Sequence, residues 1–147
     1  GMVGGQMLDL EAGKLPDQPA ASVADIMRLQ AMKTGCLIAA ACEMGAIAGK
    51  GSPTEIAALK TYGEHLGAAF QISDDLLDAE GSAADVGKAT GKDAAAGKAT
   101  LVGLLGIEQA RAHLDNSINS AIASLSAFGT KAEPLIAAAR HMGRRDS

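Results

Sequence analysis

The sequence predicts an all-α fold, and three observations carry that prediction. Apolar residues make up 48% of the 147 residues, and they show no strand-like alternation with polar residues. Aromatic residues make up only 2%, so the core must be built from Ala, Leu, Ile and Met, which suit close packing between helices. Signals for helix starts recur along the chain. We therefore expect one helical domain over residues 1–147, with no repeat and no second domain.

Two start signals place the expected helices with particular clarity. Ser22-Val-Ala-Asp25 is a variant of the capping box and opens a helix that runs to about residue 30. Ser52 is a stronger N-cap, because Pro53 follows at the first helical position and Glu55 lies three residues after the cap. Helices are expected, in chain order, over residues 2–10, 22–30, 36–48, 53–78, 100–105, 107–127 and 131–142.

Glycine and proline mark the expected breaks between these helices. Two prolines within residues 13–21 indicate a loop, and Gly49-Lys-Gly51 ends the third helix. Lys33-Thr34-Gly35 is expected to interrupt the helical pattern before residue 36. Residues 80–98 are rich in Gly and Ala, and Gly129 separates the last two helices.

Charge and cysteine usage exclude several classes of function. The net charge is −4 with no block of lysines or arginines, so no nucleic-acid partner is expected. Cys36 and Cys42 lie on roughly opposite faces of a helix, and we interpret them as reduced packing residues rather than metal ligands or a disulfide. The longest apolar stretch, Thr34 to Gly49, is short and contains Glu43. We therefore expect no membrane span, and a cytoplasmic location.

Four polar residues near the end of the fourth helix share one narrow face. Counted from Gln71, Asp74, Asp75 and Asp78 follow at offsets of 3, 4 and 7 residues, close to whole turns of an α-helix. Aspartates at these spacings repel one another, and a helix C-terminus nearby adds negative charge. A magnesium ion that in turn holds a phosphate-rich ligand would explain the arrangement. The alternative is a solvated acidic face.

A glycine-punctuated segment with three lysines follows the aspartates closely. It contains Lys88, Lys92 and Lys98, each preceded by glycine. Carboxylate-bound Mg²⁺ and lysines on a glycine-rich segment are the two halves of a diphosphate clamp, and glycine lets such a loop close over its substrate. A flexible linker is the alternative interpretation.

Five sequence blocks together resemble a known family. In order along nearly the whole chain they are Gly1-Met-Val-Gly-Gly-Gln6-Met-Leu-Asp9-Leu, Lys33-Thr34-Gly35, Phe70-Gln71-Ile-Ser-Asp74-Asp75-Leu-Leu-Asp78, Gly87-Lys88 with Gly91-Lys92-Asp93, and Gly97-Lys98-Ala-Thr100. Their order and spacing resemble the C-terminal half of the trans-prenyl diphosphate synthases, the farnesyl and geranylgeranyl diphosphate synthases. The resemblance implies the C-terminal part of the isoprenoid (terpenoid) synthase helical bundle, and hence a partial domain.

The resemblance also implies a reaction and roles for particular residues. Such enzymes ionise an allylic diphosphate, and isopentenyl diphosphate attacks the resulting cation; the short-chain, farnesyl type is expected here. Mg²⁺ is expected on Asp74, with Asp75 and Asp78 in support. The expected diphosphate-binding and catalytic residues are Lys33, Thr34, Gln71, Lys88 and Lys98. Arg144 or Arg145 in the basic tail could contact a second diphosphate, or lie in solvent. The full-length form is expected to be a homodimer.

The chain departs from the family pattern in one respect that affects activity. The family uses two aspartate-rich motifs facing each other across the cavity, and this chain contains only the second. We therefore expect the 147-residue chain alone to lack prenyltransferase activity. A non-catalytic helical interaction subunit is the competing hypothesis, although such a role needs neither the lysines nor the aspartates. A terpene cyclase is a weaker third hypothesis, because the metal motifs of terpene cyclases usually differ from Asp-Asp-x-x-Asp followed by a lysine-containing loop.

Overall fold

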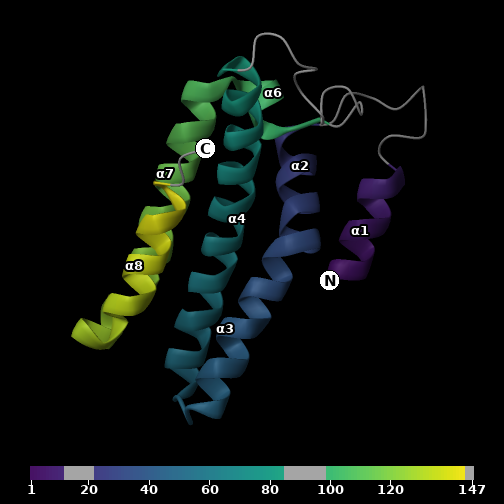
Figure 1. The fold of residues 1–147 in the computed structure, drawn as a ribbon. Helices are drawn as coiled ribbons and strands as arrows, with labels where there is room; N and C mark the ends of the chain where they lie inside the picture. Colours follow the sequence, from purple (N-terminus) through teal and green to yellow (C-terminus); the bar gives the residue numbers. More distant parts are fainter. Residues whose placement is uncertain (12–21, 85–98, 145–147) are drawn as a thin grey trace.

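The computed structural model describes residues 1–11, 22–84 and 99–144, and every regular element in these ranges is helical. The all-α prediction is confirmed. The elements are α1 (Met2–Glu11), α2 (Val23–Gln30), η1 (Ala31–Gly35), α3 (Cys36–Ala48), α4 (Pro53–Ala84), α6 (Leu101–Leu105), α7 (Ile107–Ser124), η2 (Ser126–Ala132) and α8 (Glu133–Met142). Figure 1 shows α4 at the centre of the bundle, with α2, η1 and α3 along one side and α7 along the other.

Both helix starts identified from sequence have the expected caps. The Ser22 hydroxyl accepts from the Asp25 N–H at 3.2 Å, and the Asp25 carboxylate accepts from the Ser22 N–H at 3.0 Å. Ser52 and Glu55 exchange the same pair of hydrogen bonds, at 3.3 and 2.7 Å. Each carboxylate thereby satisfies a backbone donor that has no partner within the helix. The Ser22 hydroxyl and N–H both donate to the Asp25 carboxylate and lower its pKa, and the N–H and hydroxyl of Ser52 lower the pKa of Glu55 in the same way.

The prediction that Lys33-Thr34-Gly35 interrupts the helix is wrong. Residues Ala31–Gly35 form a π-helix that joins α2 to α3, so the backbone stays helical from Val23 to Ala48. Gly35 does not break the helix, because its backbone is right-handed helical. π-Helical turns inside α-helices occur frequently at functional sites.

This continuity makes the apolar helical run longer than the stretch from Thr34 to Gly49. Within the described residues, one run, Val23–Ala48, is long and apolar enough to cross a membrane by length and composition alone. Core helices of soluble proteins, which are mostly buried, pass the same test, whereas 17% of the apolar window of this run is buried. Its apolar length is therefore only weak evidence of a membrane location.

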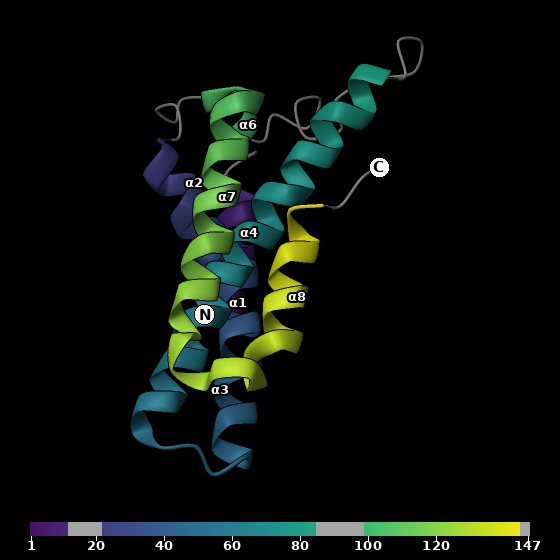
Figure 2. The same ribbon diagram turned by 90° about the vertical axis from the view of Figure 1, so that its left-hand side faces the viewer.

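The hydrophobic core lies between α4 and the C-terminal helices. On α4, Ala69, Ile72 and Leu76 are buried in it, on the side away from Gln71 and Asp75. α7 contributes Ala110, Leu114, Ile118 and Ala121 to the same core. Figure 2 shows α7 and α8 along this side of α4. The buried Tyr62 ties α4 to α8, since its hydroxyl donates to the carbonyl of Leu135 at 2.8 Å.

α4 is longer than expected, so the aspartates lie further from its C-terminus than the sequence suggested. It ends at Ala84, six residues beyond Asp78, where the sequence had suggested a C-terminus. The helix dipole acts mainly within the last turn, so it contributes little repulsion at Asp74 and Asp75. Mutual repulsion between neighbouring carboxylates remains as the term that disfavours this cluster without a cation.

Candidate functional site

The candidate site lies where η1 is packed between α1 and α4. Gln71, Asp74 and Asp75 on α4 are half-buried, whereas Asp78, one turn further on, is exposed. Opposite them, the Thr34 hydroxyl of η1 donates to Oε1 of Gln71 at 2.6 Å. The structure thus brings together two of the predicted site residues that are far apart in sequence.

Glycines allow the three helices to approach so closely. A Cβ built at Gly67 of α4 would lie 2.6 Å from the Cα of Gly35, and one built at Gly5 of α1 would overlap the backbone of Lys33. No side chain fits at either position without moving a helix backbone. The backbone of η1 is therefore in direct contact with helices on both sides.

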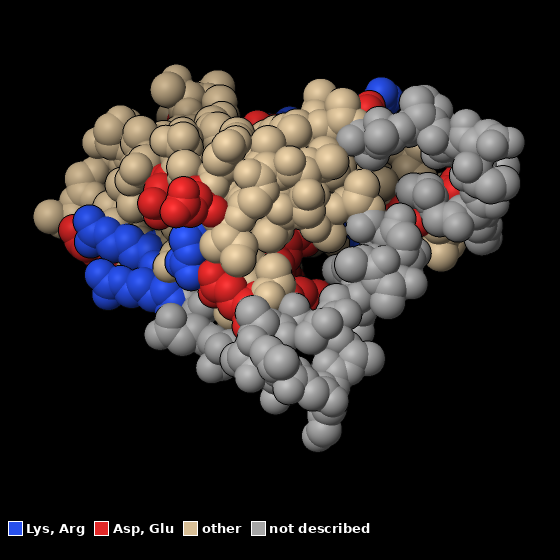
Figure 3. Space-filling view, turned by 90° about the horizontal axis from the view of Figure 1, so that it is seen from above, with Lys and Arg blue, Asp and Glu red and all other residues tan. Residues whose placement is uncertain are grey.

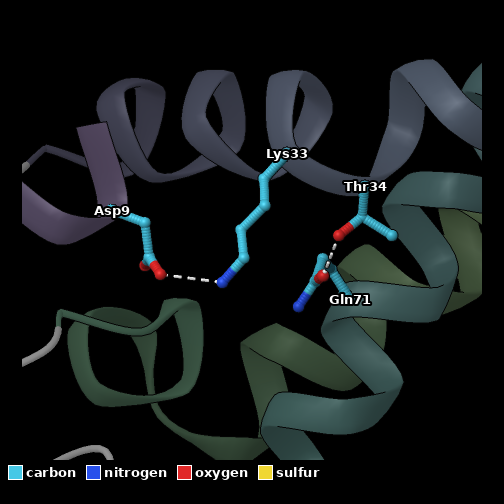
Figure 4. A network of polar contacts seen from close by, with 4 residues as sticks. All are labelled: Asp9, Lys33, Thr34 and Gln71. Atoms are coloured by element: carbon cyan, nitrogen blue, oxygen red, sulfur yellow. Dashed lines mark hydrogen bonds and ion pairs between the residues drawn. The ribbon is translucent and has the colours of Figure 1, made fainter. Parts of the chain in front are cut away.

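Lys33 points from η1 toward α1 rather than toward α4. Its Nζ donates to Oδ2 of Asp9 at 2.8 Å, and the side chains of Lys33 and Asp9 are 34% and 13% exposed. Figure 4 shows this ion pair beside the Thr34–Gln71 hydrogen bond, in the space between the three helices. Gln6 and Asp9 lie three residues apart on α1. Asp9 enters the site through this ion pair, while Gln6 is exposed.

Gln30, the last residue of α2, also belongs to the site. Its amide Nε2 donates to Oδ2 of Asp75 at 2.9 Å. This bond and the Thr34–Gln71 bond join the same two antiparallel helices one turn apart, since four residues separate the members on each helix. Sequence analysis missed Gln30. Its position one turn before Thr34 was the available signal.

The carboxylates of the site fit a magnesium ion that is bound together with a phosphate ligand, but not one that is held by protein side chains alone. Mg²⁺ is commonly held by one or two carboxylates together with substrate phosphates and water, and Asp74 and Asp75 supply oxygens of that kind. Over residues 1–11, 22–84 and 99–144, however, no group of three or more His, Cys, Asp or Glu side chains is arranged to hold a metal ion. The set therefore fits an ion that a diphosphate helps to bind, and the assignment of Mg²⁺ stays a prediction.

Other predicted residues fall partly outside the described ranges. Lys88, Lys98 and Arg145 lie there, so their predicted roles stay predictions. Arg144 is exposed after the end of α8. Figure 3 views the bundle from above and shows acidic side chains gathered near the middle of this face, beside basic side chains.

Comparison with known proteins identifies the family. Residues 1–134 match the polyprenyl synthetase family. The chain is 43% identical over 127 residues to a farnesyl diphosphate synthase of Escherichia coli, which covers 85% of this chain and 41% of the relative. It is 34% identical to geranylgeranyl pyrophosphate synthase 7 of Arabidopsis thaliana, over 100% of this chain and 42% of the relative. The crystal structure of an FPP/GFPP synthase from Zymomonas mobilis superimposes with a TM-score of 0.80 at 40% identity, over 97% of this chain and 45% of that chain.

These matches define an isoprenyl diphosphate synthase fold with the features described above. The chain belongs to the polyprenyl synthetase family. It spans less than half the length of the three relatives just named. The resemblance seen in the sequence is thereby confirmed.

Proposed function

We propose that this chain supplies one diphosphate-binding wall of a short-chain prenyl diphosphate synthase of the farnesyl (geranyltranstransferase) type. The reaction condenses an allylic diphosphate with isopentenyl diphosphate. The observation that carries this proposal is that Lys33, paired with Asp9, lies beside the Thr34–Gln71 hydrogen bond between three closely packed helices, with Asp74 and Asp75 on the same helix as Gln71. A cation, hydrogen-bonding groups and two carboxylates on rigid helices are suited to bind a diphosphate.

The residues of the chain would act on the charge of the leaving diphosphate. Lys33 stabilises the anion as the carbon–oxygen bond breaks, and Lys88 and Lys98 are assigned the same role. Thr34 and Gln71 orient each other through their hydrogen bond. Gln71 would also hydrogen-bond to the diphosphate, on the face of α4 that carries the aspartates. Bound Mg²⁺, held by Asp74 with Asp75 and Asp78 in support, would neutralise further negative charge on the phosphate oxygens.

The 147-residue chain by itself is expected to form no prenyl product. Its sequence contains one aspartate-rich motif, while the proposed reaction needs a second one across the cavity. The measurement is product formation from dimethylallyl and isopentenyl diphosphates by the purified chain. Any isoprenoid diphosphate product that depends on Asp74 would show that this expectation is wrong.

A second candidate function is that of a non-catalytic helical interaction subunit. Exposed apolar side chains on two helices favour association, among them Val3 at 71% and Met44 at 62% exposed. A homodimeric full-length protein would cover such surfaces as well. Binding of a bisphosphonate, compared between the unsubstituted chain and Asp74→Ala, separates the two functions. Binding that the substitution abolishes supports the enzyme proposal, and a folded chain that binds none favours the subunit.

A further inference from the structure

Gln30 is a buried polar side chain to which the proposed chemistry gives no role. Gln30 is 9% exposed, and within the described part of the chain only Gln30 and Ser73 are polar or charged residues that are buried. A buried amide is costly unless it is hydrogen-bonded, so its partner indicates its purpose. That partner is Oδ2 of Asp75, at 2.9 Å.

We propose that Gln30 is a positioning residue that orients the carboxylate of Asp75 toward the cation of the site. The inference rests on the proposed function, in which Asp75 supports Mg²⁺. Gln30 contacts neither substrate nor metal in this account and acts only through Asp75. Partners of this kind fix the geometry of the groups that bind a metal, and their loss commonly weakens metal affinity.

The chemistry of the amide suits this role better than a charged donor would. A lysine or arginine at this position would neutralise Asp75 and compete with Mg²⁺ for its oxygens. A neutral N–H holds the carboxylate in one orientation and leaves its negative charge available to the cation. The amide also does not change its protonation with pH, so the orientation it imposes is the same across the pH range.

The backbone that holds Gln30 is itself rigid. Gln30 immediately precedes η1, whose Gly35 is in backbone contact with Gly67 of α4. Thr34 and Gln71 form a second cross-helix hydrogen bond one turn away. Because α4 carries both Gln71 and Asp75, the two bonds fix the rotation of α4 against α2. Asp75 is thus positioned from a neighbouring helix.

If Gln30 positions Asp75, its loss should raise the Mg²⁺ concentration that pyrophosphate binding requires, and should change the pyrophosphate affinity at saturating Mg²⁺ little. We would titrate inorganic pyrophosphate into the 147-residue chain at a series of Mg²⁺ concentrations and determine the Mg²⁺ concentration that gives half-maximal binding. Gln30→Met keeps the length and the helix propensity of the side chain but removes the donor. The required Mg²⁺ concentration should rise by roughly 10- to 100-fold, the usual effect of losing such a partner. At saturating Mg²⁺, pyrophosphate affinity should approach that of the unsubstituted chain.

A matched control removes a cross-helix hydrogen bond elsewhere. Tyr62→Phe loses the hydrogen bond to the Leu135 carbonyl. Because each variant loses one hydrogen bond between helices, Tyr62→Phe and Gln30→Met should both lower the thermal midpoint of unfolding by roughly a few degrees. Only Gln30→Met should change the Mg²⁺ requirement. The side chain of Gln30→Asn is too short to reach Asp75, so this variant should raise the Mg²⁺ requirement as Gln30→Met does. It serves as the second variant if Gln30→Met does not fold.

Three outcomes are distinguishable. A raised Mg²⁺ requirement in the Gln30 variants alone supports the inference. An unchanged requirement in folded Gln30 variants, while Asp75→Asn raises it, overturns the inference and leaves the proposed function in place. If the unsubstituted chain binds no pyrophosphate at any Mg²⁺ concentration, the proposed function fails and the inference fails with it.

Discussion

Gly67 of α4 and Gly35 of η1 lie in backbone contact, so that a Cβ at Gly67 would be only 2.6 Å from the Cα of Gly35. This contact sets how close the helix bearing the aspartates lies to the helix bearing Lys33 and Thr34. The two cross-helix hydrogen bonds of the site, Thr34–Gln71 and Gln30–Asp75, depend on that separation. The contact between these two glycines, which have no side chains, therefore determines the geometry of a polar site.

Gly67→Ala should destabilise the chain. The added methyl group must push α4 and η1 apart, and such overpacking costs about 1–3 kcal/mol. Gly45→Ala is the matched control, because a Cβ at Gly45 of α3 meets nothing within 4 Å. It should stabilise the helix by about 0.5–1 kcal/mol. Urea unfolding followed by circular dichroism measures both, and equal stability of the two variants would show that the glycine contact is not tight.

Lys33→Met should weaken pyrophosphate binding in the presence of Mg²⁺ by roughly 10- to 100-fold, the value of a charged hydrogen bond. Lys60→Met is the matched control. It removes the same charge from another lysine in an ion pair, with Glu43 at 3.6 Å between α4 and α3. Isothermal titration calorimetry should find its affinity unchanged. Equal losses in both variants would mean that only the net charge of the chain matters.

The single tyrosine offers a test of packing between α4 and α8. Burial, with a smaller contribution from the nearby Cys42, raises the pKa of Tyr62 to about 12. The neutral phenol therefore stabilises the fold fully below about pH 10, the pKa in an unfolded chain, and this stability is lost as pH rises through 12. Absorbance of the phenolate at alkaline pH measures the titration, with circular dichroism reporting the fold. A midpoint near 10 while the chain is still folded would contradict the buried position of Tyr62.

Local features of the structure could be predicted from the sequence because neighbouring residues determine them. Ser22, Ser52 and Pro53 mark helix starts through bonds and geometry within one turn, and the structure agrees. The face shared by Gln71 and Asp75 likewise follows from helix period alone.

Features that depend on contacts distant in sequence could not be predicted in this way. Lys33 and Asp9 are 24 residues apart, and Gln30 and Asp75 are 45 apart, so no local pattern links them. Gly35 was interpreted as a helix breaker because a close approach to Gly67 cannot be distinguished from a break in one sequence. The end of α4 was placed at Asp78, just before the Gly- and Ala-rich residues 80–98, whereas the helix continues to Ala84.

The most direct test of the central claim is a calorimetric titration of inorganic pyrophosphate into the 147-residue chain, with and without Mg²⁺. The account predicts saturable binding with Mg²⁺, little binding without it, and loss of the Mg²⁺-dependent binding in Asp74→Ala. A chain that is folded by circular dichroism, yet binds pyrophosphate no better with Mg²⁺ than without it, would contradict the account. The interaction-subunit function would then be the better explanation of this helical chain.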